Sequence, residues 1–122
     1  MDARNVLRSR WPNIPGERLL EACCRWAEET GVLALVVFDG RAPGRLVGER
    51  DESSHCRLVG TGDETADDWI ARAATDLTAR GEAYWLVTSD RALRDAAGRH
   101  ARRTIGGGSF ARTLEAYGAN EL

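Results

Sequence analysis

The stretch GTGDETADDWI, residues 60–70, decides the fold because it joins the end of an apolar segment to the start of a long amphipathic helix. Two glycines loosen the turn. Thr65 is a favourable N-cap, and Asp68 three positions later gives a Thr-x-x-Asp variant of the capping box. Apolar residues then recur with helical spacing up to about Gly81, at Ala66, Ile70, Ala73, Ala74 and Leu77. The stretch therefore predicts a strand–turn–helix unit.

Strands and helices are predicted to alternate on both sides of this unit. Apolar runs predict strands at residues 32–38, 56–59, 83–88 and 102–105, and the first run is typical of a strand covered on both faces. Helices are predicted at 17–30, at about 91–97, and from an N-cap at Ser109 to about Tyr117. The polar residues 41–54 predict a surface excursion with at most a short strand. This order predicts an α/β fold in which a mostly parallel sheet is flanked by helices.

Composition is that of a globular protein, and 122 residues predict a single domain over residues 1–122. No apolar run reaches the roughly 18 residues that span a bilayer, and no leader opens the chain, which predicts a cytoplasmic protein without membrane contact. The net charge of −2 gives no hint of nucleic acid. All basic residues are arginines, which reflects either coding bias or a preference for bidentate phosphate contacts. Three cysteines without C-x-x-C spacing predict reduced core thiols.

Aspartates stand where ligands bind in such a fold. Asp39 and Asp90 directly follow predicted strands, and Asp67 lies in the first turn of the helix after another strand. Because ligands of parallel sheets bind beyond the carboxyl ends of the strands, these carboxylates are expected to line one edge. Clustered carboxylates raise one another's pKa unless cations intervene, and all-oxygen sites favour Mg²⁺ or Mn²⁺. Such an ion activates water and polarises phosphoryl oxygens, so the edge predicts phosphodiester hydrolysis.

Four short motifs occur in an order and spacing that resemble the NYN domain of the PIN-like nuclease superfamily, closest to its YacP-like branch. They are Asp2-x-x-Asn5, Phe38-Asp39-Gly40, Thr65-Ala66-Asp67-Asp68 and Thr88-Ser89-Asp90-Arg91. The resemblance implies a PIN-like three-layer sandwich and metal-dependent cleavage of RNA. It also implies that Asp2, Asp67 and Asp90 are the catalytic residues and first metal ligands, with Asp39 as a nearby ligand. Asn5 would orient Asp2 or the substrate.

Each candidate also has a structural interpretation. Asp67 is favoured by the helix dipole, Asp90 suits an N-cap, Asp39 suits a turn, and Asp2 stands at a terminus where disorder is common. Asp68 is expected to support the metal ligands rather than to bind the ion, since the capping box and an ion pair with Arg72 already explain an aspartate at this position. Arginines close in sequence to the acidic positions either bind RNA phosphates or are solvated surface residues. Thr88 and Ser89 either hydrogen-bond to Asp90 or to a phosphate, or they cap the end of the strand. The arginines among the predicted substrate-binding residues are Arg4, Arg41 and Arg91.

The chain departs from the family pattern at its start. The pattern has an apolar strand followed by Asp-Gly-Tyr-Asn, whereas here Ala3-Arg4 fills the tetrad and Met1 alone precedes Asp2. The resemblance places that strand at the centre of the sheet, and a sheet without it exposes unpaired edges on both halves. We expect a central strand truncated by a misassigned start rather than a shortened chain with a compromised site.

The sequence therefore predicts a small Mg²⁺- or Mn²⁺-dependent ribonuclease, an endonuclease with RNA as its partner and a possible association with the ribosome. One alternative is a non-catalytic RNA- or ribosome-binding module of the same fold. Another is a phosphohydrolase that acts on nucleotides with the same carboxylate chemistry. Titration of the protein with Mn²⁺ and a comparison of its turnover of RNA with that of free nucleotides distinguish these three functions.

Overall fold

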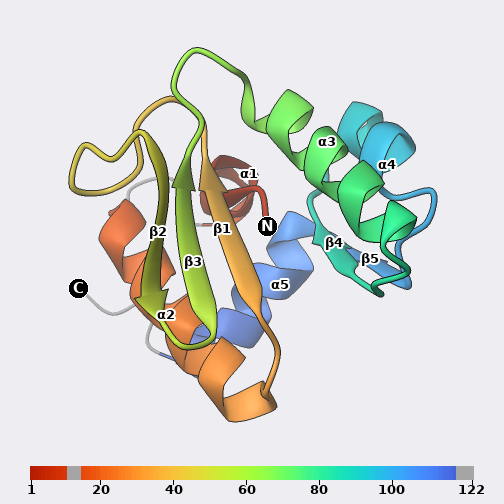
Figure 1. Cartoon of the computed structure of the whole chain (residues 1–122). Helices are drawn as coiled ribbons and strands as arrows, with labels where there is room; N and C mark the ends of the chain where they lie inside the picture. Colours follow the sequence, from red (N-terminus) through yellow and green to blue (C-terminus); the bar gives the residue numbers. More distant parts are fainter. Residues whose placement is uncertain (11–14, 118–122) are drawn as a thin grey trace.

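The computed structural model describes residues 1–10 and 15–117 (Figure 1). Helices and strands alternate as expected over most of the chain. In chain order the elements are α1 (Ala3–Arg10), α2 (Gly16–Thr30), β1 (Ala34–Phe38), β2 (Gly48–Ser53), β3 (Cys56–Gly60), α3 (Ala66–Ala79), β4 (Trp85–Val87), α4 (Arg91–Ala97), β5 (Arg103–Ile105) and α5 (Gly107–Glu115).

The strands form two separate sheets that are flanked by helices. In the larger sheet the order is β1-β3-β2, with β1 parallel to β3 and β2 antiparallel to it. In the smaller sheet β4 runs parallel to β5. The predicted α/β class is confirmed. The larger sheet is mixed, however, because β2, which lies within residues 41–54, forms an antiparallel hairpin with β3.

Strand β2 is longer than the short strand that the sequence predicted. It has six residues, all exposed except Ser53, and it lacks the apolar residues that would signal a strand. Charge pairs across the hairpin hold it, because Arg57 of β3 contacts Asp51 (Nε–Oδ1, 2.9 Å) and Glu49 (Nη1–Oε1, 3.3 Å). A charged edge strand of this kind discourages pairing with other chains.

Strand β1 is covered on both faces, as its apolar run predicted. Val36 belongs to a core shared with α2 and α5, whereas Val37 belongs to a second core shared with α3 and α4. Alternate residues of a strand point to opposite faces, so the strand separates the two cores. In the first core, Trp26 and Phe110 meet edge to face with their ring centroids 5.0 Å apart.

The first two residues are ordered between the sheets, contrary to the disorder that a terminus suggests. Asp2 makes a parallel bridge with Val37, whose N–H donates to the Met1 carbonyl (2.9 Å). On the other side the Asp2 N–H donates to the carbonyl of Val87 in β4 (3.2 Å). Residues 1 and 2 thus link β1 to β4, and α1, which was not predicted, begins directly after them (Figure 1).

Helix α5 begins earlier than its predicted N-cap at Ser109. Gly106 is the N-cap, and the N–H of Gly107 donates to the Ser89 hydroxyl (2.8 Å). A side chain from the neighbouring loop therefore does the capping that the sequence assigned to a local serine. The prediction for the end of α2 is confirmed, because Gly31 is its C-cap at φ 74°.

The cysteines are free thiols, as predicted. Burial raises the pKa of Cys23 to about 12, which is typical of an unreactive core thiol. No helix in the described part of the chain is long and apolar enough to cross a membrane.

Candidate active site

Asp2 is buried at the junction of the two sheets, with only 7% of its surface exposed. One carboxylate oxygen accepts the N–H of Asn5 (Oδ1, 3.4 Å), which caps the first turn of α1. The other oxygen accepts the hydroxyl of Thr88 (Oδ2, 3.4 Å). Residues 86 positions apart in the sequence are therefore joined at the first candidate ligand.

Thr88 connects Asp2 to Asp90. Its side chain is fully buried, and its hydroxyl accepts the N–H of Asp90 (3.1 Å) while it donates to Asp2. Asp90 in turn caps α4, since its Oδ1 accepts the N–H of Leu93 (3.0 Å). The structural interpretation of Asp90 as an N-cap is thus correct, and its cap uses one of the two carboxylate oxygens.

We expect Thr88→Val to lower the free energy of unfolding by about 1–3 kcal/mol, because it removes the buried hydroxyl and leaves the partly buried N–H of Asp90 without its acceptor. Thr88→Ser is the matched control, since it keeps the hydroxyl and loses only a methyl group, at about 0.8 kcal/mol. Urea unfolding of the two variants measures the difference. A valine variant as stable as the serine variant would show that the hydroxyl link contributes nothing.

Asp39 contacts the first turn of α3, the helix that carries Asp67. Asp39, directly after β1, accepts the N–H of Ala66 on Oδ1 (2.5 Å). Asp67 is the next residue of the helix and is exposed. The Thr65 N-cap predicted from the sequence is confirmed, because its hydroxyl accepts the N–H of Asp68 (3.1 Å). Asp39 is therefore more than a turn residue: it fixes the start of the helix that carries Asp67.

The four aspartates lie close enough to influence one another. The pKa of Asp67 is raised by desolvation and then by the negative charges of Asp90, Asp2 and Asp39, with Asp68 adding to them. The pKa of Asp2 is raised mainly by burial, with a smaller contribution from Asp39 that its hydrogen bonds and the chain terminus oppose. Carboxylates from distant segments of the chain are thus within electrostatic range of one another.

The donor chemistry of this region fits a hard divalent cation, because the four aspartates offer only oxygen donors. Within residues 1–10 and 15–117, however, no three His, Cys, Asp or Glu side chains are close enough to hold a metal ion in the positions they now have. The pKa of Asp67 is raised first by desolvation and then by its neighbours' charges, and a bound cation would relieve the second effect.

Asn5 and Arg4, among the other predicted residues, contact this edge. The Asn5 side chain accepts the N–H of Ser89 (Oδ1, 2.8 Å), so it orients the loop before Asp90. Arg4 lies 3.9 Å from Asp39 (Nη1–Oδ2), and Arg41 and Arg91 are exposed. One structural prediction is wrong, because Arg72 pairs with Glu64 (Nη2–Oε2, 2.9 Å) and not with Asp68.

Arg94 is a contributor that the sequence reasoning missed. Its guanidinium donates to the carbonyl of Thr88 (Nε–O, 3.1 Å) and so braces the loop between Thr88 and Asp90. The signal was present, since Arg94 follows Asp90 by one helical turn and therefore lies on the same side of α4.

Comparison with known proteins identifies the family of the chain. The family model of the YacP-like NYN domain matches residues 14–120, which is most of the chain. The chain belongs to the YacP-like NYN domain family. This result confirms the resemblance, and it connects the chain to PIN-like nucleases and to RNA. Of the candidates, Asp39, Asp67 and Asp90 fall inside the match, whereas Asp2, Arg4 and Asn5 precede it.

A solved structure supports the same fold. The chain is similar to the crystal structure of Rae1 (YacP) from Bacillus subtilis, with a TM-score of 0.69 and 21% identity. The similarity covers 96% of this chain and 72% of that chain. No curated protein matches the sequence.

Proposed function

We propose that this YacP-like NYN domain is a Mg²⁺- or Mn²⁺-dependent ribonuclease that hydrolyses internal phosphodiester bonds of RNA. The observation that carries the proposal is the network at the edge of the sheets. The Thr88 hydroxyl ties Asp2 to Asp90, and Asp39 holds the helix that presents Asp67. Membership of the family supports RNA as the substrate.

In this proposal Asp2, Asp39, Asp67 and Asp90 hold the cation. The caps made by Asp39 and Asp90 use one carboxylate oxygen each. The second oxygen of Asp90 would act as a ligand directly, and that of Asp39 would exchange its pairing with Arg4 for the cation. A bound divalent cation would supply Lewis-acid chemistry at a phosphoryl oxygen and lower the pKa of a bound water. Thr88 and Arg94 keep Asp2 and Asp90 in place. Asp68, on the same turn as Asp67, would support the ligands without binding the cation itself.

Arginines at the same edge would bind the RNA backbone. Arg41 lies two residues after Asp39, and Arg91 follows Asp90 as the first residue of α4; both are exposed. Arg4 has a half-exposed side chain beside Asp39. Guanidinium groups suit bidentate contacts with phosphate oxygens, and such contacts position a strand without reading its sequence. Ser89, between Thr88 and Asp90, has an exposed position that could contact the same backbone.

A non-catalytic RNA- or ribosome-binding module is the second candidate. It is favoured by the spacing of the carboxylates, since no three of the described acidic side chains are yet within reach of one cation. A module of this kind would keep the arginines and the fold but would need no metal. A nucleotide phosphohydrolase would use the same carboxylates on a smaller substrate.

Incubation of the chain with single-stranded RNA and Mn²⁺ tests the proposal. We expect internal cleavage that EDTA abolishes and that excess Mg²⁺ or Mn²⁺ restores, with little release of phosphate from free nucleotides. RNA that is bound but not cut would favour the binding module. Turnover of nucleotides without cleavage of RNA would favour the phosphohydrolase.

A further inference from the structure

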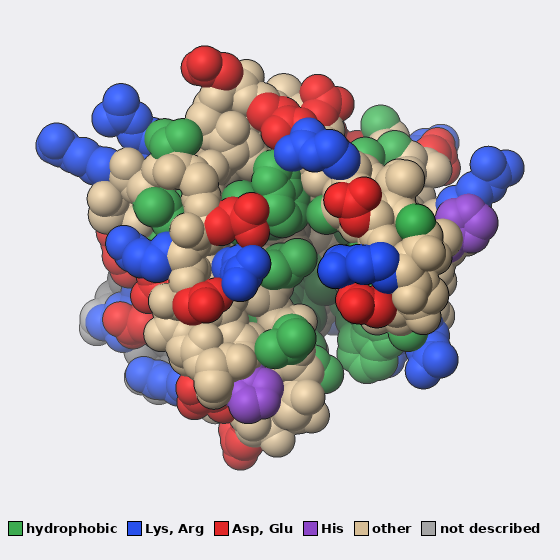
Figure 2. All heavy atoms as spheres, viewed as in Figure 1, with side chains coloured by type: hydrophobic (Ala, Val, Ile, Leu, Met, Phe, Trp, Pro, Cys, Tyr) green, Lys and Arg blue, Asp and Glu red, His purple; other side chains and the backbone are tan. Residues whose placement is uncertain are grey.

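A short turn between β1 and β2 stands beside the candidate site. Residues 41–46, here called the arginine turn, follow directly after Asp39 and Gly40 at the carboxyl end of β1. The turn carries two arginines, Arg41 and Arg45, and both are exposed. Figure 2 shows basic side chains projecting at the upper left, over the loop that joins β1 to β2 in Figure 1.

The arginine turn has a fixed shape. Ala42 and Leu46 form an antiparallel bridge with two backbone hydrogen bonds (N–O, 2.9 and 3.2 Å), so the loop between them has only three residues. Pro43 is the first of these and Gly44, with φ 79°, is the second, a sequence that is typical of a type II turn. Ala42 is buried, and Leu46 packs against the same core. The core therefore holds the base of the turn.

Contacts with β3 and the start of α3 hold the turn against the edge that carries the aspartates. Its backbone lies directly on Gly60, the last residue of β3, where an added Cβ would collide with the Leu46 carbonyl oxygen. Gly40, just before the turn, donates its N–H to the Thr61 hydroxyl (3.0 Å). Thr61 belongs to the segment that leads into α3, the helix with Asp67. The position of the turn relative to the aspartates is therefore fixed by the fold.

Arg45 has a backbone conformation that residues other than glycine rarely adopt. Its φ is 61°, and among the described residues it is the only non-glycine residue with a positive φ. Glycine or asparagine takes this conformation at a lower cost than arginine does. Strained backbone of this kind is often found at functional sites. The stability of the turn therefore does not explain why an arginine occupies this position.

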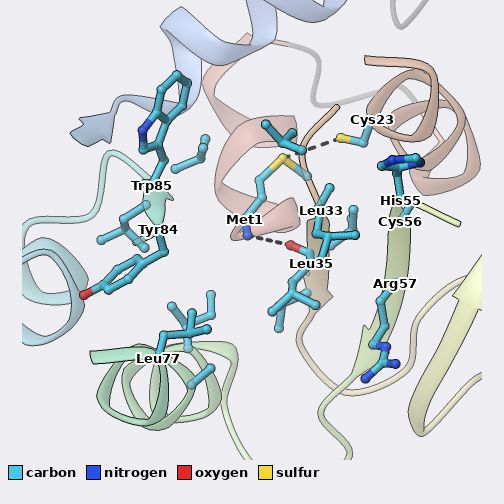
Figure 3. A pocket seen from close by; sticks show the side chains of 18 of the residues that line it. Met1, Cys23, Leu33, Leu35, His55, Cys56, Arg57, Leu77, Tyr84 and Trp85 are labelled. Carbon is cyan, nitrogen blue, oxygen red and sulfur yellow. Dashed lines mark hydrogen bonds between the residues drawn. The ribbon is translucent and has the colours of Figure 1, made fainter. Parts of the chain in front are cut away.

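The two arginines of the turn have no acidic partner. In the neighbouring hairpin, Arg50 and Arg57 both pair with acidic residues of β2. Figure 3 shows Arg57 on β3, at the side of the pocket between the two sheets. In the described part of the chain, neither Arg41 nor Arg45 takes part in an ion pair. Both guanidinium groups of the turn are therefore open to an anion from solution.

The strand order places the turn at one end of the acidic edge. It lies over the end of β3, which is next to β1, whereas Asp2 links β1 to β4 on the other side. Arg91 follows β4, so it and the turn lie on opposite sides of Asp2. A polyanion that crosses the edge would meet arginines before and after the carboxylates. Such contacts hold a nucleic-acid backbone in register without reading its sequence.

We propose that the arginine turn binds the backbone of an RNA strand on the β3 side of the phosphate that is cleaved, with Arg45 as a phosphate-binding residue. The proposal rests on RNA being the ligand of this edge, as the proposed function holds, and it adds the path of the strand. That path runs from α4 across the aspartates to the turn. A guanidinium group on a fixed turn suits this role, because little conformational freedom is lost when the phosphate binds.

Arg45→Asn tests the proposal in a binding assay without divalent metal. Asparagine suits φ 61°, so Tm should not fall. Fluorescence anisotropy with a labelled single-stranded RNA in EDTA should show binding weakened about 10-fold, because a charged hydrogen bond to phosphate is lost. The slope of log K against log [NaCl] should become less steep by about 0.7, the value for one phosphate contact on a single strand. Arg99→Asn is the matched control, since it removes the same charge beyond the far end of α4, and should stay within about two-fold of the wild type.

Cleavage and a small ligand provide the second readout. Arg45→Asn should raise the KM for RNA about 10-fold and leave kcat unchanged, because the contact is the same in substrate and transition state. A nucleoside monophosphate, which has no neighbouring phosphate, should bind equally to variant and wild type. An equal loss of monophosphate binding would place Arg45 at the reacting phosphate and overturn the proposed path.

The binding assay distinguishes failure of this proposal from failure of the ribonuclease assignment. RNA that is bound through Arg45 but never cut would support the arginine turn and refute the ribonuclease. RNA that is cut equally well by Arg45→Asn, with unchanged affinity, salt slope and KM, would overturn the arginine turn and leave the ribonuclease in place. A wild-type chain that binds no RNA would overturn both.

Discussion

Asp67→Asn is expected to abolish metal-dependent cleavage of RNA, by at least about 100-fold, while it makes the metal-free protein more stable. The loss follows from the proposed role, because even partners behind the ligands of metal sites cost 10–100-fold when removed. The gain follows from burial and charge, since desolvation and then the charges of Asp90, Asp2 and Asp39 disfavour the charged form of Asp67. Initial rates on a defined RNA and thermal unfolding in EDTA measure the two effects.

The stability gain should depend on pH with a defined sign. The pKa of Asp67 is raised in the folded protein above its value of 3.8, so the folded state binds a proton more readily than the unfolded state. The penalty is therefore present at neutral pH and disappears as pH falls below 3.8. The variant and the wild type should differ most near pH 7 and converge in acid. A difference that grows as pH falls would contradict this account.

Asp95→Asn is the matched control for the cleavage assay. Asp95 is an exposed aspartate of α4, and the substitution removes the same charge from a residue with no role in the proposed site. Its rate should stay within about two-fold of the wild type, in line with the small effects of ordinary surface substitutions. Retained cleavage in Asp67→Asn would overturn the ribonuclease assignment.

Much of the fold could be predicted because its signals are local. The apolar run before Asp39 is long enough to indicate a strand buried on both faces, and Thr65 caps its helix as the sequence suggests. Local signals also predicted that Asp39 and Asp90 follow the ends of strands. Asp90 caps α4 at Leu93, as its position suggests, whereas the contact of Asp39 with the N–H of Ala66 joins residues too far apart in sequence to be predicted from local spacing.

The features that were missed depend on contacts between distant residues. Strand β2 has no apolar signal, because it is held by backbone pairing and by charges on β3. Helix α5 starts early because Ser89, 18 residues before it, caps Gly107. Asp2 is ordered because β1 and β4 supply its backbone partners and Thr88 its hydroxyl. None of these partners can be recognised from sequence spacing alone.

Mn²⁺ is expected to raise the Tm of the wild-type chain by roughly 10 °C at a concentration about 100 times its Kd, since such binding to the folded state is worth about 2.7 kcal/mol. The increase should be small in Asp67→Asn and Asp90→Asn, each of which removes a proposed ligand. Thermal unfolding across a Mn²⁺ series measures it. The non-catalytic module, by contrast, predicts no such increase.

Two controls, added salt and lower pH, distinguish specific binding of Mn²⁺ from a general reduction of the repulsion between the four carboxylates. NaCl at matched ionic strength also screens the four carboxylates, but it should raise Tm far less than Mn²⁺, because close or partly buried charges are screened poorly. Ligand carboxylates must be deprotonated, and burial raises the pKa of Asp2 while neighbouring charges help to raise that of Asp67. The Mn²⁺-dependent increase should therefore shrink as pH falls, whereas the metal-free protein loses a repulsive penalty over the same range. An equal increase with NaCl, or one that persists in acid, would mean that the aspartates do not form a cation site.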